Sequence, residues 1–381
     1  MKKIIVDDML LTKDLPTTAG SKMLEGYMSL FEAEAISRLN GAGYTISGKA
    51  EVGEFAIDLI CETNYKGAFV KKGKLASPVA EMLDGDAEAA VCMDVNGSVR
   101  RAAAQNSLVS IKPTYGTVSR FGTVPVACSG ETVSVMAKSA DNCEAVLSII
   151  AGHDDKDGTS LSDEDCAKAK EVSPMRRIAV LGNMLKDTDL AVARKIEIFR
   201  ENLAAKGIEV CEINSDVIAA SSAAWNVLMC AELCNNVSRY DGVKYGYRAE
   251  NFSGIDELYT NSRTEAFGEL LKCAILFGSD TLSTENYMKV YDKSLRVRRV
   301  VSEAFNALFE QYDAVMMPAC SSFDYSEDIE DTAVFEENYY TAPASITGLP
   351  AVVIDGVQLV GKAFSEGSLL AFAKEYEKEA K

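Results

Sequence analysis

The sequence predicts an α/β protein, because segments with strand character alternate with segments of helical periodicity along most of its length. The alternation is clearest where a strand at 178–181 precedes a long helix at 188–206, which Gly207 ends before the next strand at 208–213. The composition, 48% hydrophobic and 25% charged over 381 residues, is that of an ordinary globular protein with enough chain for a large core.

In the first half of the chain, short connections separate the expected elements. Apolar and β-branched runs predict strands, and amphipathic runs beside capping residues predict helices. A charged run at 66–74 predicts a solvated basic loop. The expected strands lie at 4–6, 44–47, 89–93 and 107–111, and the expected helices at 29–40, 51–58, 79–83 and 139–151.

In the second half, a mainly helical stretch at about 219–309 interrupts the alternation. No repeat, low-complexity segment or long linker divides the chain. Residues 1–381 are therefore expected to form a single domain, with that stretch as an insertion packed on the sheet. The other expected elements are strands at 314–317 and 351–360, a helix at 365–377, and a rigid turn at 341–350 that contains Pro343.

Charge and cysteine content exclude several classes of function. The net charge of −18 disfavours direct binding to nucleic acid, because an acidic surface repels phosphates. No apolar run approaches 18 residues, so no membrane span is expected. The ten cysteines are scattered without a CxxC pair and, with one histidine, predict no metal site. Free thiols of this kind are typical of a cytoplasmic protein.

Residues 93–101 are the clearest candidate for chemistry. Asn96 and Gly97 form a strong turn dipeptide between a predicted strand and a run of helix formers. Ser98 is therefore expected at the start of a helix, where its hydroxyl is exposed and nearby backbone amides can bind an anion. That geometry suits a nucleophilic serine with an oxyanion hole, although a plain turn with a capping serine has the same pattern.

A serine nucleophile needs a base, and the sequence contains only one histidine, His153. His153 follows Gly152 at the exit of a predicted helix, which is a common place for a surface histidine. A lysine is therefore the more suitable base for Ser98.

Two motifs around Ser98 are specific enough to indicate a family. Residues 94–100 match an Asp-x-Gly-Gly-Ser-[Ile/Val]-Arg core with Ser98 in the nucleophile position, and residues 110–116 match a Gly-Leu-Lys-Pro-Thr-x-Gly segment. With these motifs, the chain resembles the amidase signature family over nearly its whole length. The resemblance implies the fold of that family, which is a mixed central sheet covered by helices on both faces.

Within the family, the chain is most similar to the glutamine-hydrolysing A-type subunits of tRNA-dependent amidotransferases. This similarity implies a small amide such as glutamine as the ligand, B- or C-type subunits as partners, and no cofactor. Several tens of helical residues that the family carries at its N-terminal end have no counterpart before Met1.

The resemblance also implies a catalytic triad, and the sequence departs from it at two of the three positions. The family base is a lysine at the end of the first strand, where this sequence has Val6. The bridging serine lies 24 residues before the nucleophile (98 − 24 = 74), which is Lys74 here. Val95, Asn96 and Gly97 occupy the oxyanion positions, and Asn96 replaces a glycine.

The implied substrate contacts are only partly present. Arg298 matches the arginine that binds the carboxylate of glutamine, a role that suits a guanidinium. Asn338 stands where the family has an aspartate for the amino group, so a charge that would bind the α-ammonium is absent. Tyr245, in an aromatic loop, is the third residue expected at the substrate site.

Three hypotheses about activity follow. In the first, the protein is a catalytically impaired pseudo-amidase that acts as a scaffold or ligand-binding subunit, because a serine without a base is a poor nucleophile. In the second, Lys74 lies beside Ser98 and deprotonates it, and the protein releases ammonia from glutamine or another amide. In the third, Lys2 or Lys3 supplies the base. The loss of catalytic positions from otherwise well-matched motifs favours the first hypothesis.

Overall fold

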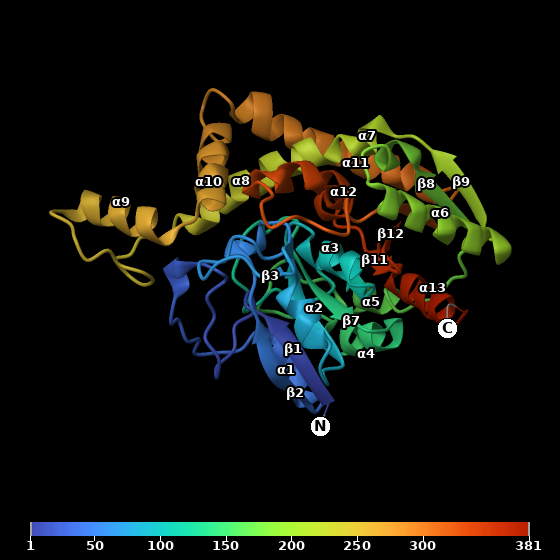
Figure 1. The fold of residues 1–381 in the computed structure, drawn as a ribbon, viewed down its shortest axis with the longest axis horizontal. Coiled ribbons are helices and arrows are strands. Elements are labelled where there is room, and N and C mark those ends of the chain that lie inside the picture. Colours follow the sequence, from blue (N-terminus) through green and yellow to red (C-terminus); the bar gives the residue numbers. More distant parts are fainter. Residues whose placement is uncertain (1, 380–381) are drawn as a thin grey trace.

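The computed structural model describes residues 2–379 and has one ten-stranded sheet at its centre (Figure 1). Across the sheet the strands are β2 (Tyr44–Ala50), β1 (Lys2–Asp7), β5 (Ala89–Asp94), β7 (Thr132–Ala137), β6 (Val109–Lys112), β11 (Ala351–Ile354), β12 (Val357–Gly361), β10 (Ala314–Pro318), β8 (Arg177–Leu181) and β9 (Glu209–Ile213). Strand β1 pairs in parallel with β2 and β5, and β8 pairs in parallel with β9 and β10. The central pairs are antiparallel, so the predicted α/β class with a mixed sheet is confirmed.

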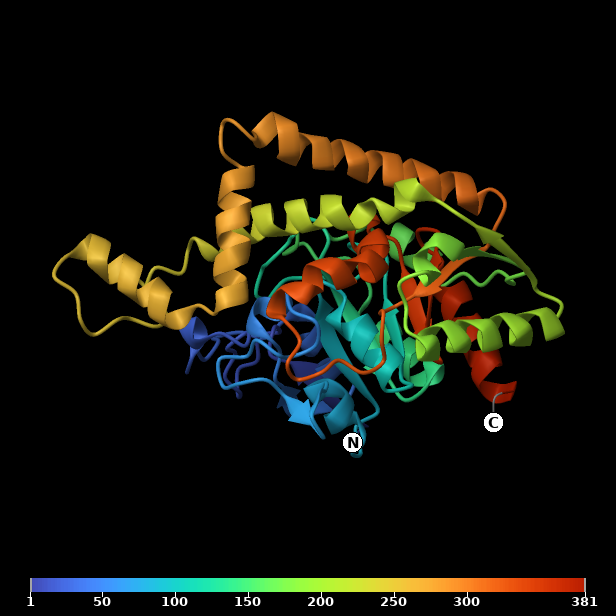
Figure 2. The same cartoon turned by 45° about the horizontal axis from the view of Figure 1, so that its top comes forward.

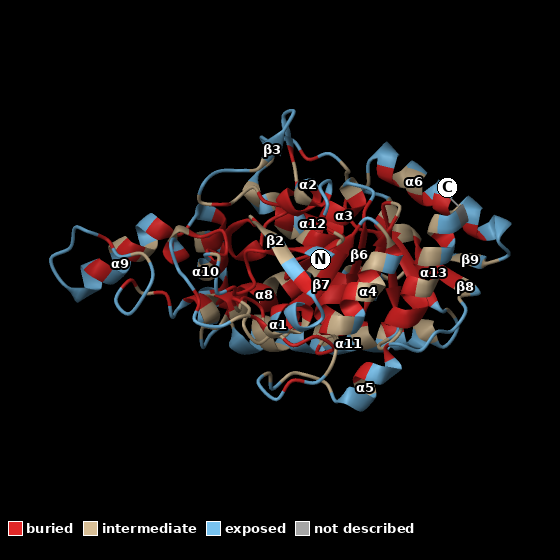
Figure 3. Cartoon of the chain, turned by 90° about the horizontal axis from the view of Figure 1, so that it is seen from below, coloured by how far each residue is buried: buried red, intermediate tan, exposed pale blue. Residues whose placement is uncertain are grey.

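Helices cover both faces of this sheet (Figures 1 and 2). One face carries α1 (Glu34–Gly41), α4 (Ala140–Ile150), α6 (Leu190–Ala205) and α13 (Glu366–Glu379). The other carries α2 (Pro78–Leu83), α3 (Ser98–Gln105) and α12 (Val334–Thr347), with α7 (Asp216–Ala219), α8 (Ser221–Val237) and α11 (Asp292–Phe309) outside them. The inner strands are buried along their whole length, as Figure 3 shows for the core, because both faces are covered.

The helical stretch between β9 and β10 forms the upper layer and an arm (Figure 1). Helix α8 packs against α10 (Glu269–Thr281), α11 and α12. Helix α9 (Ile255–Ala266) projects away from the sheet, and a break at Phe267 and Gly268 separates it from α10. Residues Asp216–Val237 are long and apolar enough to span a membrane, but half of the relevant window is buried, as in a core helix.

Several elements differ from those expected. Strand β7 and helix α12 were not predicted, and the basic loop contains the hairpin of β3 (Val70–Lys71) and β4 (Lys74–Leu75). The expected turn around Pro343 is wrong, because α12 continues through Pro343 and ends only at Gly348, which has a φ of 71°. The remaining short elements are α5 (Asp163–Lys168), η1 (Lys22–Leu24), η2 (Glu54–Ala56), η3 (Gly182–Leu185), η4 (Tyr287–Tyr291) and η5 (Asp331–Ala333).

Glu54 joins the base of the arm to the rest of the fold. Its carboxylate accepts hydrogen bonds from the Ser21 hydroxyl at 2.6 Å and from the Gly268 amide, between α9 and α10, at 2.8 Å. Burial raises the pKa of Glu54 to about 7, although both donors oppose that rise. The folded protein therefore retains a proton on Glu54 at pH values where the unfolded chain has released it.

We expect Glu54→Gln to reduce the loss of stability that accompanies rising pH. The protonated wild-type carboxyl contributes its full share of stability below its unfolded pKa of 4.5. This stability is lost as the pH rises through the folded pKa of about 7. Between these two pH limits, the Glu54 contribution to the free energy of unfolding changes by about 3 kcal/mol. The glutamine amide oxygen can accept from the Gly268 amide, and its nitrogen can donate to the Ser21 hydroxyl oxygen. Urea unfolding from pH 5 to 8 should therefore show a flatter profile for the variant. Parallel profiles for the two proteins would contradict the assignment.

Candidate functional site

A tight turn brings Ser98 to the start of a helix. Strand β5 ends at Asp94, and Gly97 adopts a φ of 89° before α3 begins at Ser98. A Cβ atom on residue 97 would lie 2.4 Å from the Cβ of Thr341, so only glycine fits there. The local sequence thus produces the strand–turn–helix arrangement expected around Ser98.

A fully buried ion pair holds this turn. The Arg100 guanidinium donates to both carboxylate oxygens of Asp94, at 2.9 and 3.0 Å. Burial alone would raise the pKa of Asp94, but the charge and hydrogen bonds of Arg100 outweigh it and hold that pKa below its usual value. The remaining Arg100 donors contact the Thr341 carbonyl, the Gln358 amide oxygen and the Ser345 hydroxyl, at 2.8 to 2.9 Å.

The side chain of Asn96 is held within the core. Its amide nitrogen donates to the Ile57 carbonyl at 2.8 Å, and its amide oxygen accepts from the Trp225 indole at 2.9 Å. The Thr341 hydroxyl donates to the Asn96 carbonyl at 3.1 Å. In contrast, the backbone amides of Asn96 and Gly97 have no hydrogen-bond acceptor within residues 2–379. The turn therefore keeps donors of the kind that an oxyanion hole requires.

Ser98 lines a very small cavity. The cavity has a volume of about 20 Å³, and its lining includes Ser98, Asp7, Ser77, Pro78 and Met93. Sites for small ligands usually measure about 300–1,000 Å³, whereas a space of about 10–15 Å³ admits one water molecule. The described residues provide no hydrogen-bond partner for the hydroxyl itself. In this conformation, the cavity has room for water but not for glutamine.

Asp7 places a buried carboxyl group at the wall of this cavity. Its two oxygens accept from the backbone amides of Met93, at 2.6 Å, and Met9, at 3.1 Å. Burial raises the pKa of Asp7 to about 7, even though both amides lower it. No hydrogen bond joins Asp7 to Ser98 among the described contacts, so the carboxyl does not activate the hydroxyl in this arrangement.

None of the lysines within residues 2–379 lines the cavity beside Ser98 or donates to its hydroxyl. Val6, the residue expected at the position of the family lysine, is fully buried in β1. Lys74 lies on the β3–β4 hairpin, where its ammonium pairs with Asp324 at 2.7 Å and its side chain is 52% exposed. It does not line the cavity, so the geometry required for a Ser98–Lys74 dyad is not formed.

The three expected substrate residues lie outside this cavity. Arg298 is partly buried on α11 and donates to the Ser129 carbonyl at 2.8 Å. Asn338 is buried on α12, where its amide nitrogen donates to Asn226 at 2.6 Å. Tyr245 is 46% exposed in the loop before α9. None of the three has a hydrogen bond to Ser98 within the described residues, which also contain no cluster of metal-ligating side chains.

The sequence did not indicate two residues around Ser98: Ser77, which lines the cavity, and Trp225, which contacts the turn through Asn96. Ser77 caps α2 by accepting from the Ala80 amide at 3.2 Å, and it lies three positions after Lys74. A serine followed by Pro78 is a recognisable helix start, so this signal was present. Trp225 left no local signal, because it reaches Asn96 from α8 across 129 positions of sequence.

Comparison with known proteins shows what this arrangement resembles. A sequence model of the family described as Amidase matches residues 3–70 and 85–370, which leaves out 71–84, the segment that carries Lys74 and Ser77. The chain is 32% identical over 402 residues to the A-type subunit of the Glutamyl-tRNA(Gln) amidotransferase of Lachnoclostridium phytofermentans, and the alignment covers 97% of this chain and 81% of that protein.

Solved structures show the same likeness. The crystal structure of the corresponding Glutamyl-tRNA(Gln) amidotransferase polypeptide from Thermotoga maritima is similar with a TM-score of 0.82 and 27% identity, covering 99% of this chain and 83% of that one. The structure of 6-aminohexanoate cyclic dimer hydrolase in complex with its substrate has a TM-score of 0.79 at 18% identity, covering 99% and 84%, which shows a shared fold.

We expect Arg100→Met to destabilise the protein by about 3–5 kcal/mol, because it leaves the Asp94 carboxylate buried without a partner. Arg299→Met is the matched control, because Arg299 pairs with Glu303 on the exposed surface of α11. The control should change stability by less than about 1 kcal/mol. Guanidinium unfolding of both variants measures the difference, and equal losses would refute the central role of Arg100.

Proposed function

The chain belongs to the amidase family, and we propose that it is a catalytically impaired member with a scaffold role in a larger assembly. The proposal rests on the Ser98 site, where the fold is retained but the means of activating the serine are absent. A serine hydroxyl without an adjacent base is a poor nucleophile at neutral pH.

One observation carries most of this proposal: Ser98 lines a cavity of about 20 Å³ while the residue expected at the base position is a buried valine, Val6. The cavity is too small for an amino-acid amide in this conformation. The unmatched family segment at 71–84 supports the same conclusion, because part of the cavity wall comes from it. The amides of Asn96 and Gly97 would then be a remnant of the oxyanion hole.

The partners are inferred from the relatives. Those relatives are named as the A-type component of an amidotransferase, which marks them as parts of a larger enzyme. Under our proposal, this chain binds B- or C-type subunits in the cytoplasm and contributes structure rather than glutamine hydrolysis.

The first test is an ammonia-release assay with glutamine and with simple amides. Wild type, Ser98→Ala and Lys74→Ala should all give background rates, with an active glutaminase as the positive control. Ser98→Ala should also change stability by less than about 0.5 kcal/mol, because its hydroxyl has no partner in the described structure. A rate that both substitutions abolish would refute the proposal and support the Ser98–Lys74 dyad.

The second test is coexpression with B- and C-type subunits from the same genome. We expect a stoichiometric complex by size-exclusion chromatography with light scattering, and Ser98→Ala should assemble as well as wild type. An isolated chain that remains monomeric in the presence of both subunits would argue against the scaffold role.

A further inference from the structure

Strand β2 leaves one edge of the sheet open. It is the terminal strand of the order and pairs only with β1, and the outer side of residues 46–50 has no strand partner within residues 2–379. A free strand edge presents unpaired N–H and C=O groups to a further strand. At the opposite edge, Glu209 and Glu212 of β9 form ion pairs with Arg177 and Arg200. Charged side chains of this kind on an edge strand discourage the addition of another strand.

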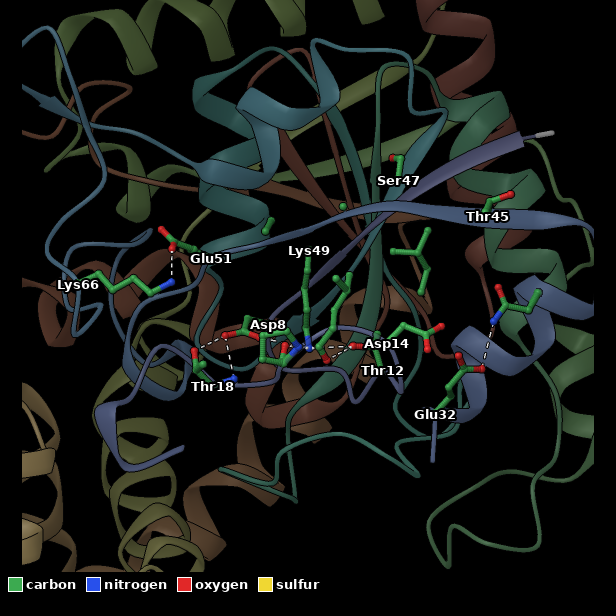
Figure 4. Close-up of a pocket in the computed structure, with 16 residues that line it drawn as sticks. Asp8, Thr12, Asp14, Thr18, Glu32, Thr45, Ser47, Lys49, Glu51 and Lys66 are labelled. Atoms are coloured by element: carbon green, nitrogen blue, oxygen red, sulfur yellow. Dashed lines mark hydrogen bonds and ion pairs between the residues drawn. The ribbon is translucent and has the colours of Figure 1, made fainter. Parts of the chain in front are cut away.

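A groove of about 570 Å³ runs beside β2 (Figure 4). Its lining includes residues 45–51 consecutively, together with the segment from Thr12 to Thr18 and, farther along, Glu32 and Asn40. Successive side chains of a strand point to opposite faces, so consecutive lining residues indicate that the groove follows the strand edge rather than one face. Its volume is within the range of about 300–1,000 Å³ for ligand sites.

The two lysines that line the groove are both paired with acidic residues. Lys49 reaches across to the opposite wall, where its ammonium contacts Asp8 at 3.2 Å and donates to the Pro16 carbonyl at 2.8 Å (Figure 4). The Lys66 ammonium pairs with Glu51 at 2.8 Å. Both lysines are therefore already neutralised by carboxylates of the groove.

Two further carboxylates of the groove remain without a cation. Asp14 is exposed, and Glu32 accepts a hydrogen bond only from Asn40 at 3.1 Å; neither has an ion-pair partner within the described chain. Four lining carboxylates face two lining ammonium groups, so the groove carries an excess of two negative charges. A cationic occupant would balance this excess.

We propose that this groove binds an extended, lysine- or arginine-rich segment of a partner protein, which adds to the sheet as a strand beside β2. The backbone of that segment would pair with the β2 edge, and its cationic side chains would reach Asp14 and Glu32. A second copy of this chain is a poor occupant, because each copy has a net charge of −18 and would bring the same carboxylates into contact. The inference rests on the proposed scaffold role for the existence of a partner, but the purified chain alone can test it.

The experiment measures binding of a fluorescein-labelled eight-residue peptide of alternating lysine and valine by fluorescence anisotropy. The double variant Asp14→Asn/Glu32→Gln should bind about five- to tenfold more weakly than wild type, because two ion pairs are lost. Lys13→Ala is the matched control, since Lys13 is exposed beside Asp14 but does not line the groove. Thermal unfolding of all three proteins verifies that they are folded.

Two comparison peptides test the mode of binding. A peptide methylated on alternate backbone nitrogens keeps its charge but cannot pair with β2, so it should lose at least about tenfold in affinity. A peptide with glutamate in place of lysine should not bind. Equal binding of all peptides, or no effect of Asp14→Asn/Glu32→Gln, would overturn the proposal. A dimer in analytical ultracentrifugation that this double variant strengthens would also overturn it, with a second copy as the occupant. None of these results depends on the ammonia assay.

Discussion

The buried ion pair between Asp94 and Arg100 is the contact on which the geometry around Ser98 depends. Arg100 uses all five guanidinium donors, because it binds both oxygens of Asp94 and reaches Thr341, Ser345 and Gln358. These partners come from the end of β5, from α12 and from β12, so one side chain ties the turn to three elements. A charge with no exposure to solvent is tolerated only when it is paired and hydrogen-bonded in this way.

Charged residues of the motifs that carry the family resemblance make buried packing contacts. Asp94 and Arg100 form the central ion pair, and Lys112 of the second motif is buried, with its ammonium donating to the Leu349 carbonyl at 3.1 Å. Burial, with the nearby Arg100 charge, lowers the pKa of Lys112 to about 7. These residues would be retained for folding whether or not Ser98 reacts. Family membership is therefore compatible with the impaired catalysis that we propose.

The fold was predictable to the extent that its elements have a local pattern. Strands β1 and β5 and helices α4 and α6 lie within a few residues of their expected places, because apolar runs and capping residues specify them locally. Helix α12 was missed because Pro343 normally ends a helix. Here side chains distant in sequence anchor the turn of α12 that precedes Pro343: Gln358 donates to the Tyr340 carbonyl at 2.9 Å and Arg100 to the Thr341 carbonyl at 2.8 Å.

For the candidate site, the sequence alone determined that Ser98 begins a helix after a tight turn, because Asn-Gly turns and helix starts depend on neighbouring residues. Only the tertiary structure decided which side chains face it. The family resemblance implied that Lys74 lies beside Ser98, but the hairpin directs its ammonium toward Asp324, and Ser77 lies at the cavity instead. Side-chain direction and cavity size depend on contacts between segments far apart in sequence, and no local pattern encodes them.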